Sequence, residues 1–111
     1  MYPTTAIVSF AVGLLLTTGS VVAEAVGERL YFESCAVCHG EDGMGAMPGI
    51  RNLTEKNGPL SKPTPELVSV ILNGVDRPGL STPMPAKGGN DEITPSLARE
   101  IVKFMQEEFA K

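Results

Sequence analysis

Five consecutive residues, Cys35-Ala36-Val37-Cys38-His39, contain both cysteines of this 111-residue chain and its only histidine. Cysteines three positions apart on one helical turn project to the same side, so two thiols can form thioether bonds with the two vinyl groups of one haem. The imidazole of His39 then lies under the iron as an axial ligand. The motif therefore predicts a fold built around one covalently attached haem c, held by Cys35, Cys38 and His39.

Three other uses of the motif fit less well. A structural zinc site needs four ligands, and the chain has three Cys and His residues in total. A thioredoxin-like redox pair belongs to a strand-helix-strand pattern, and no Val/Ile-rich strand precedes Cys35. A disulfide between Cys35 and Cys38 would close a loop too small to stabilise the fold much. Haem remains the predicted cofactor, and it would supply the centre of a core in a chain that has no Trp and only four Phe.

The first 25 residues resemble a targeting segment. Residues 1–23 carry no charged side chain, and an apolar run from Ala6 to Leu16 is followed by an A-x-A site at Ala23-Glu24-Ala25. This pattern predicts a signal peptide over residues 1–25 and a mature domain over residues 26–111, although the leader lacks a Lys or Arg near its start. Residues 6–23 are also just long enough for a retained membrane anchor. Both alternatives place the domain in the periplasm or otherwise outside the cytoplasm.

The formal net charge is −4, and removal of Glu24 with the leader would make it −3. An acidic domain lacks the basic field that phosphate binding needs, so nucleic acid is not an expected partner. A membrane is an expected partner only if the leader is retained.

The remaining sequence predicts three or more helices and no strands. The first carries Gly27 and Tyr31 and leads into the cysteines. The second has Thr64 as its N-cap and stops at Asn73-Gly74, and the third begins at Thr94-Pro95. Apolar residues of the third helix recur on one face, at Leu97, Ile101, Phe104 and Met105.

Residues 26–111 resemble the class I cytochromes c. Gly27 and Tyr31 match the small residue and the aromatic on the N-terminal helix of that family, while Ile101 and Phe104 match positions on its C-terminal helix. The resemblance implies an all-α class I cytochrome c fold in which these helices cross closely, Gly27 allows the approach and Tyr31 meets Phe104. An N-terminal apolar leader helix would precede this domain.

A second axial ligand should come from the opposite face of the haem. Of the five methionines, Met1 belongs to the leader, Met105 falls on the buried face of the last helix, and Met44 and Met47 follow His39 too closely. Met84 remains, and the string Thr82-Pro83-Met84-Pro85-Ala86 resembles the ligand loop of the family. The predicted iron ligands are therefore His39 and Met84.

Residues 40–50 form a glycine-rich loop without the Lys-Ser/Thr ending of a phosphate-binding loop. The family resemblance implies that the Pro48 carbonyl accepts a hydrogen bond from the second imidazole nitrogen of His39. It also implies that Ile50 packs beside the haem ring.

An iron bound by both His39 and Met84 has no open position for substrate, so one-electron exchange is the chemistry that remains. The predicted function is an exported mono-haem electron carrier, not an enzyme, between a redox donor and acceptor such as a dehydrogenase, an oxidase or another cytochrome. One alternative is a haem c subunit bound tightly to a periplasmic dehydrogenase or oxidase complex. Another is a sensor or small-gas binder, which would require Met84 to be off the iron.

Overall fold

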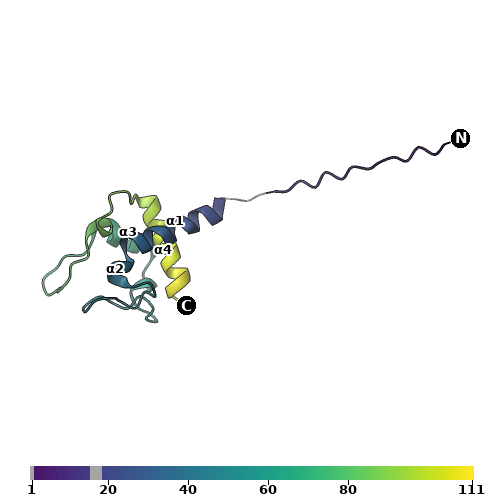
Figure 1. Cartoon of the computed structure of the whole chain (residues 1–111). Coiled ribbons are helices and arrows are strands. Elements are labelled where there is room, and N and C mark those ends of the chain that lie inside the picture. The colour runs from purple at the N-terminus through teal and green to yellow at the C-terminus, as the bar shows by residue number, and fades with distance from the viewer. Residues whose placement is uncertain (1, 16–18) are drawn as a thin grey trace.

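The computed structural model describes residues 2–15 and 19–111, and Figure 1 shows a helical domain with an extended N-terminal tail. No strand occurs in the described ranges apart from one isolated two-residue bridge. The predicted all-α class is confirmed. The helices, in chain order, are α1 Gly19–Ser34, α2 Ala36–His39, the short 3-10 helix η1 Pro59–Ser61, α3 Thr64–Asn73, the 3-10 helix η2 Ala86–Gly89, and α4 Pro95–Phe109.

Helix α1 packs against α4 (Figure 1), and Gly27 of α1 lies against the backbone of α4 at Glu100. A Cβ atom at Gly27 would collide with the backbone carbonyl of Glu100, so the absence of a side chain is what lets the two backbones approach this closely. One turn further along α1, the rings of Tyr31 and Phe104 lie 5.4 Å apart, centroid to centroid. Both contacts implied by the family resemblance are confirmed. The crossing fixes the end of α1, from which the Cys35 to His39 turn continues.

Apolar side chains from α1, α3, α4 and the connecting loops form one core beside this crossing. Two members of the predicted face of α4, Ile101 and Met105, are buried, while Leu97 and Phe104 are partly buried and pack against the core. No polar or charged residue is buried in the part of the chain that the structure describes. The largest fully buried side chains are Tyr31, Leu30, Ile93, Ile101 and Val102.

The two predicted N-caps have different outcomes. The Thr94 side chain accepts a hydrogen bond from the Leu97 N–H at 3.2 Å, which confirms it as the N-cap of α4. Thr64 is instead the first residue of α3, and the N-cap position belongs to Pro63 without a side-chain bond. The prediction for Thr64 is wrong because the Pro63 carbonyl already accepts the first helical hydrogen bonds. Helix α3 ends at Asn73 before Gly74, as predicted.

The predicted apolar leader helix is absent from residues 2–15, which have no regular secondary structure. The side chains of Phe10 and Leu15 are 88% and 93% exposed. The stability of a helix in water comes mainly from packing of its apolar face, and the exposed side chains of Phe10 and Leu15 provide no such packing. Met1 and residues 16–18 of the predicted leader lie outside the described residues. Within the described ranges, no helix has the length and apolarity needed to cross a membrane.

Candidate haem site

The Cys35 to His39 segment forms a single tight turn at the end of α1. Cys35 interrupts the helix, and its carbonyl accepts hydrogen bonds from the N–H of Cys38 at 3.2 Å and of His39 at 2.9 Å. Helix α2 then consists of residues 36–39 alone. Cys35 is buried, Cys38 is partly exposed, and both are free cysteines. The turn therefore presents two separate thiols rather than a disulfide.

Burial keeps two groups of this turn uncharged. It raises the pKa of the Cys35 thiol to about 11, with a smaller contribution from the neighbouring Cys38. It also lowers the pKa of the His39 imidazole. At neutral pH, His39 is therefore the free base, which is the form that can donate a nitrogen lone pair to iron.

The Nδ1 atom of His39 is buried and has no hydrogen-bond partner among the described residues. The expected bond to the Pro48 carbonyl is therefore absent from this structure. Backbone bonds hold the loop differently: the carbonyls of Cys38 and His39 accept from the N–H groups of Ala46 and Gly45, both at 2.8 Å. A turn closed by the bond from the Ile50 N–H to the Met47 carbonyl then leaves Pro48 exposed and Ile50 partly buried.

Tyr31 holds the residue that follows His39. Its hydroxyl donates a 2.5 Å hydrogen bond to the Gly40 carbonyl, although the Tyr31 side chain is otherwise surrounded by apolar groups. The sequence predicts that Tyr31 lies at the helix crossing, but it does not predict this bond. The available indication was the residue type, because a buried tyrosine usually finds a partner for its hydroxyl.

Met84 lies on a segment fixed by backbone contacts. Met84 and Val75 exchange two hydrogen bonds, of 2.8 and 2.9 Å, which close the loop after α3. A Cβ atom at Gly74 would collide with the Met84 carbonyl, so this glycine allows the close approach. The Met84 side chain is partly buried and packs against the core, whereas Met44 and Met47 are 56% and 38% exposed.

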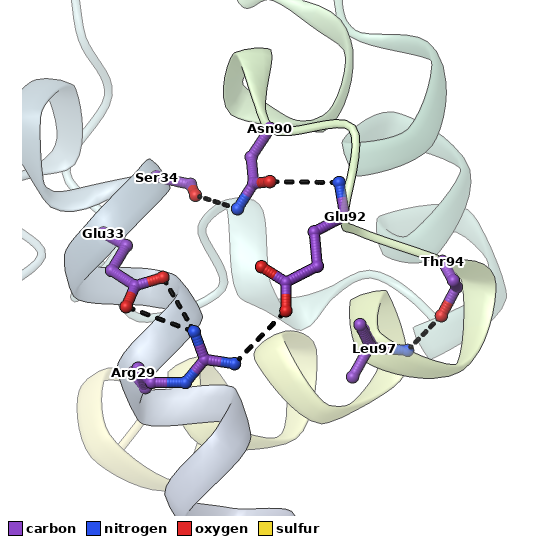
Figure 2. A network of polar contacts seen from close by, with 7 residues as sticks. All are labelled: Arg29, Glu33, Ser34, Asn90, Glu92, Thr94 and Leu97. Atoms are coloured by element: carbon purple, nitrogen blue, oxygen red, sulfur yellow. Dashed lines mark hydrogen bonds and ion pairs between the residues drawn. The ribbon is translucent and has the colours of Figure 1, made fainter.

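The Met84 segment, residues 81–90, has two contacts with the part of the chain around the Cys35 to His39 turn. One is with the loop after the turn, and the other is with Ser34 immediately before it. On one side, Gly49 packs closely against Ser81. A Cβ atom added to Gly49 would lie only 2.6 Å from the Ser81 hydroxyl oxygen. On the other, the Asn90 side-chain amide donates to the Ser34 hydroxyl at 3.0 Å (Figure 2). The structure thus connects the two segments that carry the predicted axial ligands. Ser34 and Asn90 are 56 positions apart, and no local sequence pattern could have paired them.

The chemistry of these residues fits a c-type haem. The turn offers two free thiols and a neutral imidazole whose buried Nδ1 is unpartnered, and a thioether lies on the segment joined to that turn. Throughout the described part of the chain, no cluster of three or more His, Cys, Asp or Glu residues could hold a metal ion. A zinc site of protein ligands alone is therefore not found there.

Comparisons with known proteins identify the family. Residues 22–105 match the family described as cytochrome C oxidase, cbb3-type, subunit III. The chain is 33% identical over 93 residues to cytochrome c-555 of Chlorobaculum tepidum, and the match covers 82% of this chain and 83% of that protein. It is 36% identical over 82 residues to the Cbb3-type cytochrome c oxidase subunit CcoP of Rubrivivax gelatinosus, covering 74% of this chain but only 26% of that longer protein. Domains of this kind carry covalently attached haem c. The chain therefore belongs to the class I c-type cytochromes, within the family of the cbb3-type oxidase subunit III.

Proposed function

We propose that this protein is an exported mono-haem electron carrier that passes single electrons between redox proteins. The observation that carries the proposal is the connection of the Met84 segment to the Cys35 to His39 turn on two sides, at Gly49 and at Ser34. This connection supports one site with an axial ligand from each segment. When bound there, haem c supplies one-electron exchange between ferric and ferrous iron.

The chain's own residues have distinct roles in this site. The thiols of Cys35 and Cys38 would attach the group covalently, and the neutral imidazole of His39 would be one of its iron ligands. The Met84 thioether would be the other iron ligand, and the backbone bridge to Val75 limits how far the Met84 backbone can move. An iron held by both His39 and Met84 would leave no position for a substrate, which supports a role in carrying electrons over one in catalysis.

The Met84 assignment is tested by substitution. Met84→Ala should remove the far-red sulfur-to-iron charge-transfer band of the ferric protein and lower the reduction potential, because thioether ligation favours ferrous iron. It should also allow carbon monoxide to bind the ferrous form rapidly, whereas wild type should bind it slowly. Met44→Ala and Met47→Ala are controls at exposed positions and should keep the band. Loss of the band in a control, with its retention in Met84→Ala, would show that the ligand is misassigned.

A tightly bound haem c subunit of an oxidase complex is the second candidate function. The family description and the similarity to a Cbb3-type oxidase subunit favour it. Gel filtration of the native protein from membrane and periplasmic fractions separates the two functions. A carrier should migrate at about 10 kDa, whereas a subunit should co-elute with a large redox complex.

The proposed location is outside the cytoplasm, after removal of residues 1–25. The A-x-A site and the uncharged apolar leader support this location. The proposed partners are a donor and an acceptor that are themselves redox proteins.

A further inference from the structure

The segment from Met84 to Asn90 is held at both ends. At its start, the Met84 backbone pairs with Val75. Inside it, the Gly88 N–H donates to the Pro85 carbonyl at 3.2 Å, and the Asn90 N–H donates to the Lys87 carbonyl at 3.0 Å. These local bonds make η2 a compact unit. A displacement of Gly88 or Asn90 is therefore expected to shift the Met84 backbone, which lies only a few residues away in the same unit.

Ser34 contacts this unit in two ways. Its hydroxyl accepts the hydrogen bond from the Asn90 amide, and its carbonyl oxygen would lie 2.6 Å from a Cβ atom placed on Gly88. Ser34 is also the residue immediately before Cys35, so it shares a peptide bond with the attachment turn. The contact thus links the second ligand segment to the turn that holds His39.

Figure 2 also shows the neighbouring polar contacts, which are more exposed than the bond between Ser34 and Asn90. The ion pair between Arg29 and Glu92 has an N···O distance of 3.5 Å and side chains that are 46% and 57% exposed. Exposed pairs of this kind contribute little to stability. The bond between Ser34 and Asn90 is partly buried, and Asn90 is oriented for it because its other side-chain atom, Oδ1, accepts from the Glu92 N–H at 3.0 Å.

We propose that Ser34 and Asn90 are positioning residues for the Met84 ligand. Their hydrogen bond keeps the segment 84–90 against the attachment turn and so determines how often the Met84 sulfur leaves the iron. This inference rests on the proposed function, because it requires Met84 to be the second axial ligand.

The test compares two serines that each accept a hydrogen bond from an asparagine amide. Ser34 joins two segments, whereas Ser69 accepts from Asn73 at 3.1 Å within α3. In the haem-loaded ferrous protein, Ser34→Ala should increase the carbon monoxide association rate about fivefold, the change expected when a hydrogen bond of typical net strength is lost. Ser69→Ala should keep the wild-type rate. An unchanged rate in Ser34→Ala, or an equal rise in both variants, would overturn the inference.

Two further comparisons separate positioning from general destabilisation. Asn90→Asp should keep a nearly wild-type rate, because a carboxylate can accept from both the Ser34 hydroxyl and the Glu92 N–H, whereas Asn90→Ala should raise it. Gly88→Ala and Gly89→Ala introduce a side chain at similar left-handed φ values of 58° and 78°, but only Gly88 contacts Ser34. Gly88→Ala should raise the rate and Gly89→Ala should not, and equal effects would assign the change to backbone strain instead.

The charge-transfer band of wild type distinguishes this inference from the proposed function. If ferric wild type lacks the band, the assignment of Met84 fails and the positioning role fails with it. If wild type has the band and the Ser34 and Asn90 variants bind carbon monoxide as slowly as wild type, the positioning role fails and the proposed function stands.

Discussion

At the residue scale, Tyr31 combines a packing role with a polar one. Its ring lies between 5.2 and 5.5 Å, centroid to centroid, from the rings of Phe32, Phe104 and Phe109. Its hydroxyl meanwhile holds the Gly40 carbonyl next to His39. Burial raises the pKa of Tyr31 well above its usual value, so the hydroxyl keeps its proton and remains a donor throughout the neutral and mildly alkaline range.

Tyr31→Phe should separate these two roles. The variant keeps the ring contacts but loses the donor, so the free energy of unfolding should fall by about 1–2 kcal/mol. Tyr31→Ala, which also loses the ring, should cost about 3–5 kcal/mol. Denaturant unfolding of the haem-loaded protein measures both. Equal losses would contradict a separate contribution from the hydroxyl.

The two cysteines give a second prediction at this scale. Replacing Cys35 and Cys38 together by Ala should yield a polypeptide from which acid-acetone removes all haem, because axial ligands alone are not covalent bonds. Wild type from an export host with haem c maturation should keep one haem through the same extraction. Recovery of wild type at its unmodified polypeptide mass would contradict covalent attachment.

At the element scale, the loop after α3 depends on Gly74, which the sequence marks as the end of the helix but not as a contact of Met84. Gly74 and Gly79 both have left-handed φ values, 71° and 91°, but a Cβ atom at Gly79 meets nothing within 4 Å, whereas one at Gly74 meets the Met84 backbone. Gly79→Ala should therefore cost only the left-handed strain, about 1–2 kcal/mol. Gly74→Ala should cost more and should also weaken the charge-transfer band. A normal band in Gly74→Ala would show that this contact does not control Met84.

Two kinds of feature could be predicted from the sequence: those set by bonds between residues close in the chain, and those that the family places at a fixed spacing. Thr94-Pro95 marks the start of α4 because its cap bond spans only three residues, and Gly27 marks the crossing because the family places it at a fixed spacing from Cys35. The predicted leader helix is wrong over residues 2–15, because an apolar sequence indicates a tendency to be buried and does not by itself form a helix, whereas residues 19–25 belong to α1. The contact between Ser34 and Asn90 joins distant parts of the chain, so only the folded backbone reveals it.

The hydrogen bond expected between His39 and the Pro48 carbonyl was not predicted correctly for a different reason. A family resemblance supplies contacts made in the family, whereas the hydrogen bonds of Gly45 and Ala46 decide how this loop folds back on the attachment turn. They leave Pro48 at the exposed corner of a turn and His39 Nδ1 without a partner in the described part of the chain. The hydrogen bonds by which this loop folds back on the attachment turn were therefore not predicted from the sequence.

At the scale of the whole molecule, the predicted leader overlaps the first helix of the domain. Helix α1 runs from Gly19 to Ser34 and so includes the predicted cleavage site after Ala25. Val26 packs partly against the core, and Gly27 makes the contact with α4, whereas Val22 is 63% exposed. A chain that begins at Val26 would therefore retain the helix crossing and every buried core residue of the described structure.

Processing after Ala25 should consequently leave the folded domain intact, and N-terminal sequencing of the periplasmic protein should give Val26 as the first residue. Ala25→Leu should block cleavage, because signal peptidase requires a small residue there, and should shift the protein into the membrane fraction. Val22→Leu, a change at an exposed position three residues earlier, serves as the control and should be processed normally. Wild type that retains Met1 and needs detergent for extraction would instead establish the anchor, and electron transfer would then be limited to partners within reach of the same membrane.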